Sequence, residues 1–554
     1  MKPFYLKGGK TVLDKKLSRR SFLTLSAATA ASFALDWKQI AAYAANMGPK
    51  GNYPTVIIGS GLGGLCCGAY LSRFGIPVTL IEQHHIPGGY ATSFDRAGGK
   101  FTFEVSLHGT SIHNNAAARS LKDLGVLEKL QLIELPDVLR FKDPKMDIPF
   151  PSRDPEALIR ALAEYFPAEK EGIRGVIQEI IGIAEEAEKS AREKKVSRAN
   201  FPLLYPKMWN ARDKTLADFL DSYVKDPLLK NVLAAQWGSY GLPPSKLSGF
   251  YYAVALGQYL RNGSYYVKPR SQELSLALTR AIETSGGKIL YGTRAEKIIV
   301  KDNAVDRVEL SGGKVLTARA VVSNASAITT FKEMLPREVV PADYLKKLET
   351  YRPSISSFIV WLGLNQELRG RIKGYRHRVI SGRGPEDDYQ FSVNGEVDKG
   401  SFGVVIYDNL FEGYSKPGTS TVTLLFLTGH EPWRKFEADY RLGRKEAYNR
   451  DKARWTDILI RRAEEVIPGL SSMIEVKESA TPLTNWTFTR NYEGAIYGFE
   501  QSMDNAYMNR LDNRTPIRGL YLASAWSNPG GGYSAVLRSG EITFGKMIED
   551  WGLI

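Results

Sequence analysis

The chain has 554 residues, a formal net charge of +14 and a hydrophobic content of 43%. This composition excludes a disordered chain and is typical of a globular protein with two or more domains. Beyond the first fifty residues, no apolar run reaches the roughly 20 residues that a membrane-spanning helix needs. The positive charge favours anionic surfaces such as lipid headgroups, but no compact basic motif accompanies it, so we expect no nucleic-acid partner.

Residues 1–45 have the features of a signal peptide. A lysine-rich beginning leads to Arg19 and Arg20, the uncharged stretch Phe22–Leu35 follows, and small residues near position 45 offer a cleavage site. The sequence SRRSFL resembles the twin-arginine export motif, which implies a protein exported in its folded state and a periplasmic location. An ordinary secretory signal and an uncleaved amphipathic anchor are the alternatives.

The chain beyond the signal peptide stays basic. The first 44 residues hold eight Lys or Arg and two Asp, so the remainder keeps a net charge of +8. A basic stretch, Glu188–Arg198, continues a helix predicted over Gly175–Ala187. Two interpretations of this stretch stay open, a solvated helix face and a face that contacts a membrane. Peripheral membrane contact is therefore a hypothesis.

The two cysteines, Cys66 and Cys67, are adjacent. Adjacent cysteines cannot form a normal structural disulfide with each other, and their spacing fits no zinc site. The six histidines include no H-E-x-x-H spacing. We therefore expect no metal, and we assign both cysteines to the core of a buried helix.

A strand, a glycine-rich turn and a helix are predicted directly after the signal peptide. Residues 55–58, TVII, form a β-branched run that a proline opens, which is typical of a buried strand. The next helix ends near Gly75, and residues 77–82, PVTLIE, form a second strand. Together they make a βαβ unit of about 30 residues, the size expected of a dinucleotide-binding unit.

The turn carries the fingerprint G-x-G-x-x-G at Gly59, Gly61 and Gly64. The first glycine allows the tight turn, the second lets the backbone approach a pyrophosphate, and the third permits close packing of helix on strand. The helix begins here and directs its N–H groups and positive dipole end at the phosphates, and Gly63 belongs to the same end. Glu82, 18 residues after Gly64, is placed to accept hydrogen bonds from ribose hydroxyls. The unit predicts a bound dinucleotide, since a turn without a ligand would leave Glu82 unexplained.

The residues after Glu82 resemble the extended FAD fingerprint of the flavin amine oxidase and phytoene desaturase superfamily. Gly88 and Gly89 follow the acid by six and seven residues, and a strand is predicted over Phe103–His108, FEVSLH. The resemblance implies that the glycine pair passes the flavin and that the strand runs under its ring. Three residues depart from the usual pattern: Tyr90, Glu104 and Ser106.

Residues 273–324 resemble the segment that returns to the FAD domain in this superfamily. We predict one helix followed by four strands, and the resemblance implies that the backbone near Ala295 approaches the adenine. Relatives have two glycines before the helix, whereas this chain has Arg270. Arg270 either serves an anionic group or is exposed.

The C-terminal segment, Arg518–Ile548, resembles the superfamily's ending, a strand, a Pro-Gly-rich turn and a helix. The helix opens at Gly530–Ser534, where its backbone N–H groups would face the pyrimidine end of the flavin and favour negative charge there. The resemblance places four residues at the cofactor: Ser524, Gly531, Gly532 and Tyr533. The cofactor that it implies is FAD.

A further segment, Thr481–Ser502, resembles carotenoid isomerases, phytoene desaturase relatives and retinol saturases, and amine oxidases generally lack it. Flavin chemistry leaves little for side chains to do, so the catalytic residues stay unknown. His108 and Tyr497 are weak candidates, and Glu493 is weaker.

The sequence predicts an α/β fold, with a discontinuous Rossmann-type FAD-binding domain of the glutathione reductase kind and an inserted α+β substrate domain. The FAD-binding domain is assigned to residues 53–135, 265–335 and 480–554, and the substrate domain to residues 136–264 and 336–479. The substrate domain is rich in aromatic residues, which serve either core packing or an apolar pocket. They are Phe201, Tyr205, Trp209, Phe250, Tyr251, Tyr252, Tyr259, Tyr265 and Tyr266.

These resemblances imply an FAD-dependent oxidoreductase that desaturates, saturates or isomerises an apolar, unsaturated lipid of the carotenoid or isoprenoid kind. A flavin amine or amino-acid oxidase is the first alternative, and a pocket with a charged clamp would favour it. A flavin-bearing lipid carrier without catalytic activity is the second. A membrane quinone is a hypothesis for the electron acceptor.

Overall fold

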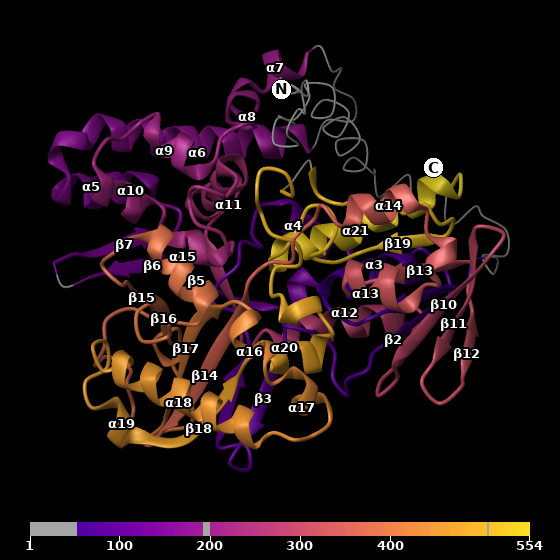
Figure 1. Ribbon diagram of the computed structural model, residues 1–554. Coiled ribbons are helices and arrows are strands. Elements are labelled where there is room, and N and C mark those ends of the chain that lie inside the picture. The colour runs from indigo at the N-terminus through magenta and orange to yellow at the C-terminus, as the bar shows by residue number, and fades with distance from the viewer. Residues whose placement is uncertain (1–52, 144, 192–199, 507–508, 554) are drawn as a thin grey trace, which may run out of the picture.

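The computed structural model describes residues 53–143, 145–191, 200–506 and 509–553 (Figure 1). The predicted signal peptide lies outside these ranges, and so does most of the basic stretch after Ala191. The helix predicted before that stretch is α6, Lys170–Ser190. Among the described residues, no helix is both long and apolar enough to cross a membrane.

A five-stranded parallel sheet has the order β19-β13-β1-β2-β9. In chain order its strands are β1 (Thr55–Ile58), β2 (Val78–Ile81), β9 (Lys288–Leu290), β13 (Ala320–Ser323) and β19 (Leu520–Leu522). β1 and β13 are buried along their whole length, as parallel strands covered on both faces are. The strands come from distant parts of the chain, so the predicted discontinuous Rossmann-type domain is confirmed.

Helices cover one face of this sheet and a small sheet covers the other. The helices are α3 (Leu62–Arg73), α12 (Gln272–Thr284) and α21 (Tyr533–Asp550), with α3 packed against both others. The small antiparallel sheet consists of β10 (Ala295–Lys301), β11 (Ala304–Leu310) and β12 (Val315–Thr317). Both cysteines are free and buried in α3, as predicted.

A seven-stranded mixed sheet forms the second part of the molecule, with the order β18-β14-β17-β16-β15-β6-β7. Its strands are β6 (Asp137–Lys142), β7 (Asp147–Pro151), β14 (Ser356–Leu364), β15 (Arg376–Val379), β16 (Phe402–Ile406), β17 (Ser420–Thr428) and β18 (Ile474–Ala480). One face packs on α18, Glu446–Ala463, through a core that includes Trp433 and Trp455. The arrangement is the expected α+β architecture.

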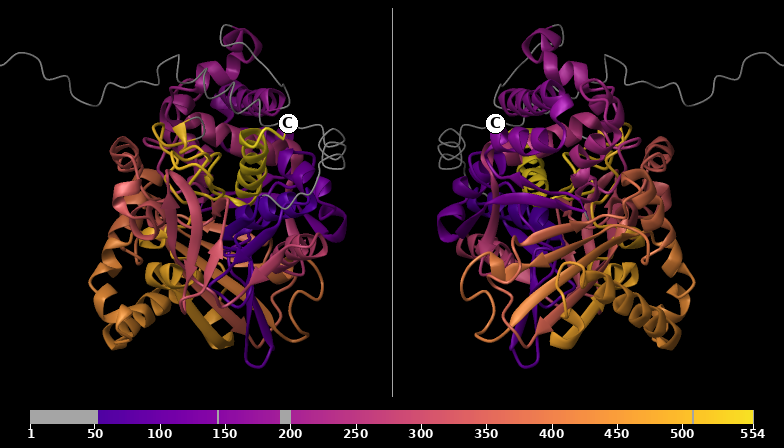
Figure 2. Two further views of the ribbon diagram at one scale, coloured as in Figure 1. Left: turned by 90° about the vertical axis from the view of Figure 1, so that its right-hand side faces the viewer. Right: turned by 90° about the vertical axis from the view of Figure 1, so that its left-hand side faces the viewer.

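A helical layer lies at the end of the molecule opposite α18 (Figures 1 and 2). Besides α6 it contains α5 (Pro155–Tyr165), α8 (Pro206–Ala211), α9 (Leu216–Asp221), α10 (Pro227–Leu233) and α11 (Gly249–Asn262). These helices share a core of their own, which includes Phe201, Tyr205, Phe250 and Tyr252. Most of the aromatic residues noted in the sequence therefore serve packing.

Two sequence-based element boundaries are wrong. Five strands follow α12 instead of the four predicted. Only two residues separate β12 from β13, so the sequence does not show that the two strands pair in different sheets. The strand predicted to reach His108 is β4, Phe101–Glu104, which ends earlier. Its partner β3, Ser93–Arg96, begins opposite Glu104, so the chain beyond that point has no strand to continue the pairing.

Candidate functional site

A cavity of about 1740 Å³ lies between the two main sheets. It meets the parallel sheet at the carboxyl ends of its strands, where open α/β sheets bind their ligands. Four of the lining residues follow different strands of that sheet: Gly59 after β1, Glu82 after β2, Asn324 after β13 and Ser524 after β19. The chain thus places the predicted nucleotide-binding residues around one cavity, except Gly64, which does not line it.

The N-terminus of α3 opens into this cavity. Gly61 is its N-cap, no side chain caps it, and its first turn holds no acidic residue. A Cβ on Gly63 would lie 2.3 Å from the carbonyl oxygen of Ala523, and one on Gly64 would lie 2.3 Å from that of Gly59. The turn therefore requires glycine for close backbone approach, and the uncapped helix end is suited to a phosphate.

Glu82 is held in place at the end of β2. Its carboxylate accepts hydrogen bonds from the backbone N–H of Ser60 (2.8 Å), from Ser60 Oγ (2.6 Å) and from the backbone N–H of His84 (2.8 Å). A carboxylate has about four acceptor positions. Since Glu82 also lines the cavity, one position remains for a ligand hydroxyl.

The glycine pair after Glu82 meets the beginning of α21. Gly88 and Gly89 have φ values of +124° and +60°, which favour glycine. The hydroxyls of Tyr533 and Ser106 donate hydrogen bonds to the carbonyl oxygen of Tyr90 at 3.0 and 2.8 Å. These contacts fix the two loops against each other at the cavity.

The N-terminus of α21 is the second uncapped helix end at the cavity. Its N-cap is Gly532, with φ +101°, and its first turn holds no acidic residue. Gly531 and Tyr533 also line the cavity. This end is therefore suited to a ligand that carries negative charge, as the C-terminal motif predicted.

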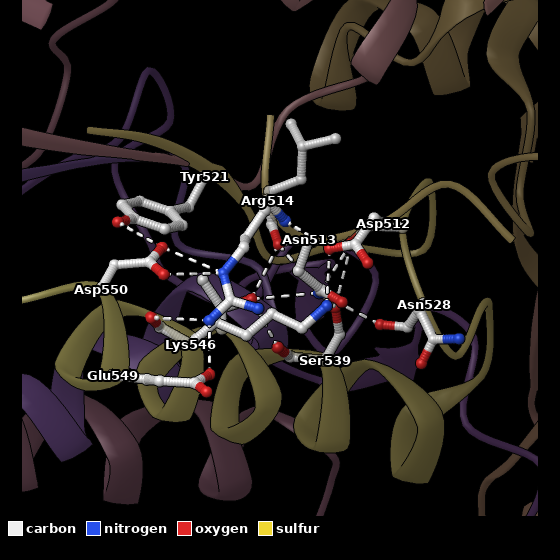
Figure 3. A network of polar contacts seen from close by, with 12 residues as sticks. Asp512, Asn513, Arg514, Tyr521, Asn528, Ser539, Lys546, Glu549 and Asp550 are labelled. Carbon is white, nitrogen blue, oxygen red and sulfur yellow. Dashed lines mark hydrogen bonds and ion pairs between the residues drawn. The ribbon is translucent and has the colours of Figure 1, made fainter. Parts of the chain in front are cut away.

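A buried asparagine positions the loop before α21 (Figure 3). Asn513 Nδ2 lies within 3.2 Å of five acceptors on β19, on the loop and on α21. They are Leu522 O, Ser527 Oγ, Asn528 O, Ser539 Oγ and Thr543 Oγ1. Asn513 is fully buried, so it couples the strand, the loop and the helix into one unit. No motif in the sequence indicated this residue.

The candidate catalytic residues differ in their placement. His108 lines the cavity, and its Nδ1 lies 3.0 Å from the hydroxyl of Tyr407. Burial, and then the charge of Arg376, lowers the pKa of His108 to about 3, so its ring is neutral. Tyr497 lines the cavity and donates a hydrogen bond to Gly238 O (2.9 Å). Glu493 faces Arg434 instead, at 3.5 Å, and is not a lining residue.

Arg270 and Glu104 have structural roles. Arg270 is buried and donates hydrogen bonds to the carbonyl oxygens of Thr102 and Tyr414. The expectation that it is exposed is therefore wrong, whereas its positive charge does act on an anionic group, the buried carboxylate of Glu104. The carboxylate of Glu104 accepts from Ser271 and from Tyr266 (2.9 Å), and burial raises the pKa of Glu104.

Two arginines of the cavity were missed by sequence reasoning. Arg376 and Arg378 lie on β15 and line the cavity. The available signal was the pattern Arg-x-Arg in a short strand, where alternate side chains share one face. Of the aromatic residues noted in the sequence, Tyr251 and Tyr259 also line the cavity.

The parallel sheet, the two uncapped helix ends and the carboxylate after the second strand define an FAD-binding oxidoreductase fold. Residues 62–543 match the family described as flavin containing amine oxidoreductase. The chain belongs to this family and is an FAD-dependent oxidoreductase.

Several characterised proteins are similar to the chain along most of its length. Prolycopene isomerase 1 of an Oncidium hybrid cultivar is 25% identical, and the match covers 90% of this chain and 84% of the relative. The phytoene desaturase (lycopene-forming) of Pseudescherichia vulneris is 26% identical, with coverages of 90% and 99%. The structure of cyclohexylamine oxidase from Brevibacterium oxydans has a TM-score of 0.57 at 12% identity, with coverages of 90% and 99%. The structural likeness shows a common fold.

Proposed function

We propose that the protein acts on an apolar, unsaturated lipid of the carotenoid or isoprenoid kind, by desaturation, saturation or isomerisation. The observation that carries the proposal is the wall of the cavity beyond two loops, the one with Gly88 and Gly89 and the one before α21. It is formed largely by apolar and aromatic side chains: Leu139, Val254, Ala255, Ile359, Trp361, Val405, Leu425 and Leu427. Such a wall binds hydrocarbon by excluding water. The names of the two relatives, an isomerase and a desaturase, favour the same substrate class.

The residues present fit FAD. Gly61 and Gly63 would hold the pyrophosphate at α3, Glu82 the ribose and the Ala295 backbone the adenine. The flavin end would be held by four residues: Gly89, Ser524, Gly532 and Tyr533. Bound FAD would supply hydride or electron transfer at its ring. At the ring's pyrimidine end, the positive dipole end of α21 would stabilise negative charge.

The protein's own groups near the lipid would orient it and exclude water. Burial raises the pKa of Tyr251 to about 12 and also raises that of Tyr259, so both hydroxyls stay protonated at neutral pH. His108 is neutral at the same pH because its pKa is about 3. These groups would donate or accept hydrogen bonds, but none is set up to remove a proton from a hydrocarbon, so selectivity would come from shape and position.

The test is anaerobic spectroscopy of the purified holoenzyme. Flavin absorption that bleaches with a partly saturated polyene, or returns from the reduced state with a more unsaturated one, would support redox action. A change of polyene absorption without net flavin reduction would support isomerisation. If neither flavin nor polyene changes with any polyene offered, the proposal fails and a carrier role would be favoured.

A flavin amine or amino-acid oxidase is the second candidate, because Arg376 and Arg378 provide the kind of cationic clamp that a substrate carboxylate needs. Flavin reduction by apolar amino acids or by simple amines, with no response to polyenes, would favour it. The motif at Thr481–Ser502 argues for the lipid instead.

For location and partners, we propose twin-arginine export to the periplasm and contact with the membrane surface. Leu203 is 81% exposed and Leu204 42% on α7, Phe201–Leu204. The cavity reaches Ala187 and Ala191 at the end of α6, so an apolar substrate could enter from a lipid surface nearby. Binding to anionic vesicles should weaken with salt and with Leu203→Ser, and salt-independent binding would contradict the proposal.

The electron acceptor that we propose is a membrane quinone. A periplasmic enzyme has no assured supply of NAD(P)H, and quinones are available in the membrane. Reoxidation of the reduced flavin by a soluble quinone analogue, measured anaerobically, is the test. Reoxidation by oxygen alone would contradict this part of the proposal.

A further inference from the structure

Two arginines of one strand present their side chains to the apolar cavity. Arg376 and Arg378 on β15 are half-buried, whereas His377 between them is buried. Both arginines line the cavity. The alternation of side chains along a strand therefore places two guanidinium groups side by side on the cavity face.

The protein supplies few acceptors to these groups. Among the described residues, Arg376 donates two long hydrogen bonds, to Val138 O (3.4 Å) and Ser239 Oγ (3.3 Å). Arg378 donates to Ser401 Oγ (2.7 Å). A guanidinium has five N–H donors, and within the described parts of the chain no carboxylate forms an ion pair with either arginine. Each group thus retains capacity for an oxyanion.

The surroundings do not neutralise this charge. Burial raises the pKa of Tyr259 and Tyr497, so these hydroxyls near Arg376 are uncharged, and His108 is neutral. The charge of Asp388 acts on Arg378, but among the described residues the two form no ion pair, and Oδ1 of Asp388 accepts from the backbone N–H of Ser401 (3.0 Å). Partly burying cations without an ion-paired carboxylate is costly, so a ligand that brings an anion would be bound preferentially.

The arginines lie one layer of side chains from the loop assigned to the flavin. A Cβ on Gly238 would lie 2.6 Å from Arg378 Nη1, so the guanidinium covers this glycine. The hydroxyl of Tyr497 donates to Gly238 O, and a Cβ on Gly531 would lie 2.7 Å from Tyr497 O. The chain of contacts from Arg378 through Gly238 and Tyr497 to Gly531 is continuous. A group held by the arginines is therefore anchored close to the loop at Gly531 that is assigned to the flavin.

We infer that the ligand of this cavity is an amphiphile, an apolar unsaturated chain that ends in an oxyanion, and that Arg376 and Arg378 bind this head group. The apolar part of the inference rests on the proposed function, whereas the anion site rests on the arginines alone. Carboxylate and phosphate both match the planar guanidinium, which binds either through two parallel hydrogen bonds. The head group fixes the register of the chain against the flavin end, which a pure hydrocarbon could not do.

The experiment measures binding of four probes to the holoenzyme through the shift of the visible flavin spectrum. The probes are oleate, oleyl phosphate, oleyl alcohol and methyl oleate, which share one chain. Charged hydrogen bonds of this kind correspond to roughly 10- to 100-fold in affinity. We expect oleate or oleyl phosphate to bind at least about tenfold more tightly than the alcohol and the ester, and the tighter of the two identifies the head group.

Variants distinguish the loss of the anion site from a general loss of structure or of lipid binding. Arg376→Gln and Arg378→Gln should remove most of the preference for the charged probes while leaving the affinity for oleyl alcohol nearly unchanged. Arg376→Lys should restore part of it. Arg307→Gln, a change of a surface residue on β11 that pairs with Asp306, is the matched control and should behave as the wild type.

Several outcomes would overturn the inference. Equal affinity for oleate and oleyl alcohol would do so, as would a preference that survives when Arg376→Gln and Arg378→Gln are combined in one variant. A loss of FAD content without a change in head-group preference would assign the arginines to the cofactor instead. Turnover of lycopene, a neutral polyene, at rates that both variants leave unchanged would refute the anion site and leave the proposed function standing. Arginine-dependent oleate binding without any polyene chemistry would support the anion site and refute the proposed function.

Discussion

Replacement of Asn513 by leucine tests whether the hydrogen-bond network in Figure 3 holds the loop before α21 in place. Leucine keeps the branching of the side chain, with somewhat bulkier methyl groups, but removes both N–H donors of Nδ2, which has five acceptors within 3.2 Å. Among these acceptors, the carbonyl oxygen of Asn528 belongs to the loop itself. Each buried polar group that loses its partner costs about 1–3 kcal/mol. For two lost donors we expect the free energy of unfolding to fall by about 2–5 kcal/mol.

Thermal unfolding measures this fall in the free energy of unfolding as a shift of Tm. An unfolding entropy of about 2.1 cal/mol/K per residue amounts to about 1 kcal/mol/K for a chain of about 500 residues, so Tm should fall by about 2–5 °C. Flavin fluorescence should report release of FAD at the lower temperature, together with weaker FAD binding by the apoprotein. Arg514→Gln is the control, since its ion pairs with Glu549 and Asp550 are partly exposed and worth at most about 1 kcal/mol. An Asn513→Leu variant with wild-type Tm and FAD affinity would refute the coupling.

Three further predictions address the cofactor loops and the cavity. Gly63→Ala places a Cβ 2.3 Å from a backbone carbonyl oxygen, so the purified protein should retain less than about a tenth of the wild-type FAD. Gly403→Ala, whose nearest neighbour is 3.9 Å away, should retain it all. Glu82→Gln should weaken FAD binding by roughly tenfold or more in a fluorescence titration of the apoprotein, because a charge-assisted hydrogen bond to ribose is lost; unchanged affinity would remove Glu82 from the site. His108 has a folded pKa of about 3, below the unfolded value near 6.5, so the unfolded chain binds the extra proton between these pH values and the stability falls as the pH drops below 6.5. His108→Asn should reduce the slope of the free energy of unfolding against pH between pH 6 and 4 by up to about 1 kcal/mol per pH unit, which a flatter pH dependence of Tm would report. Parallel Tm profiles of variant and wild type would show that His108 is not buried as described.

The FAD-binding half could be predicted because its signals are local. Gly59, Gly61 and Gly64 are spaced by the backbone requirements of one turn, and Glu82 ends the next strand. The C-terminal turn before Tyr533 carries similar information within a few residues. Element boundaries were harder, since β12 and β13 are almost continuous in sequence and only their pairing with different sheets separates them.

The substrate side could not be predicted, because its chemistry depends on contacts between distant segments. The role proposed for Arg376 depends on the apolar wall that other strands and helices place around it. The role of Asn513 depends on its hydrogen bonds to β19 and α21. A single arginine or asparagine in a sequence has no spacing rule that indicates either role. Most aromatic residues of the substrate domain were likewise indistinguishable from core residues until the helical layer was seen to bury them.

The two helix ends at the cavity depend on each other. A Cβ on Gly540 of α21 would lie 2.5 Å from the carbonyl oxygen of Gly63 in α3, so these helices pack at backbone contact. α3 stands at the beginning of the described chain and α21 at its end, which means that the cofactor site is complete only after the last helix has docked. FAD bound to this assembled site stabilises the folded state by mass action. A chain threaded through a membrane unfolded would lose the site and would have to find FAD again outside the cell. The same packing that builds the site is therefore an argument in favour of the proposed export of the folded, FAD-loaded protein.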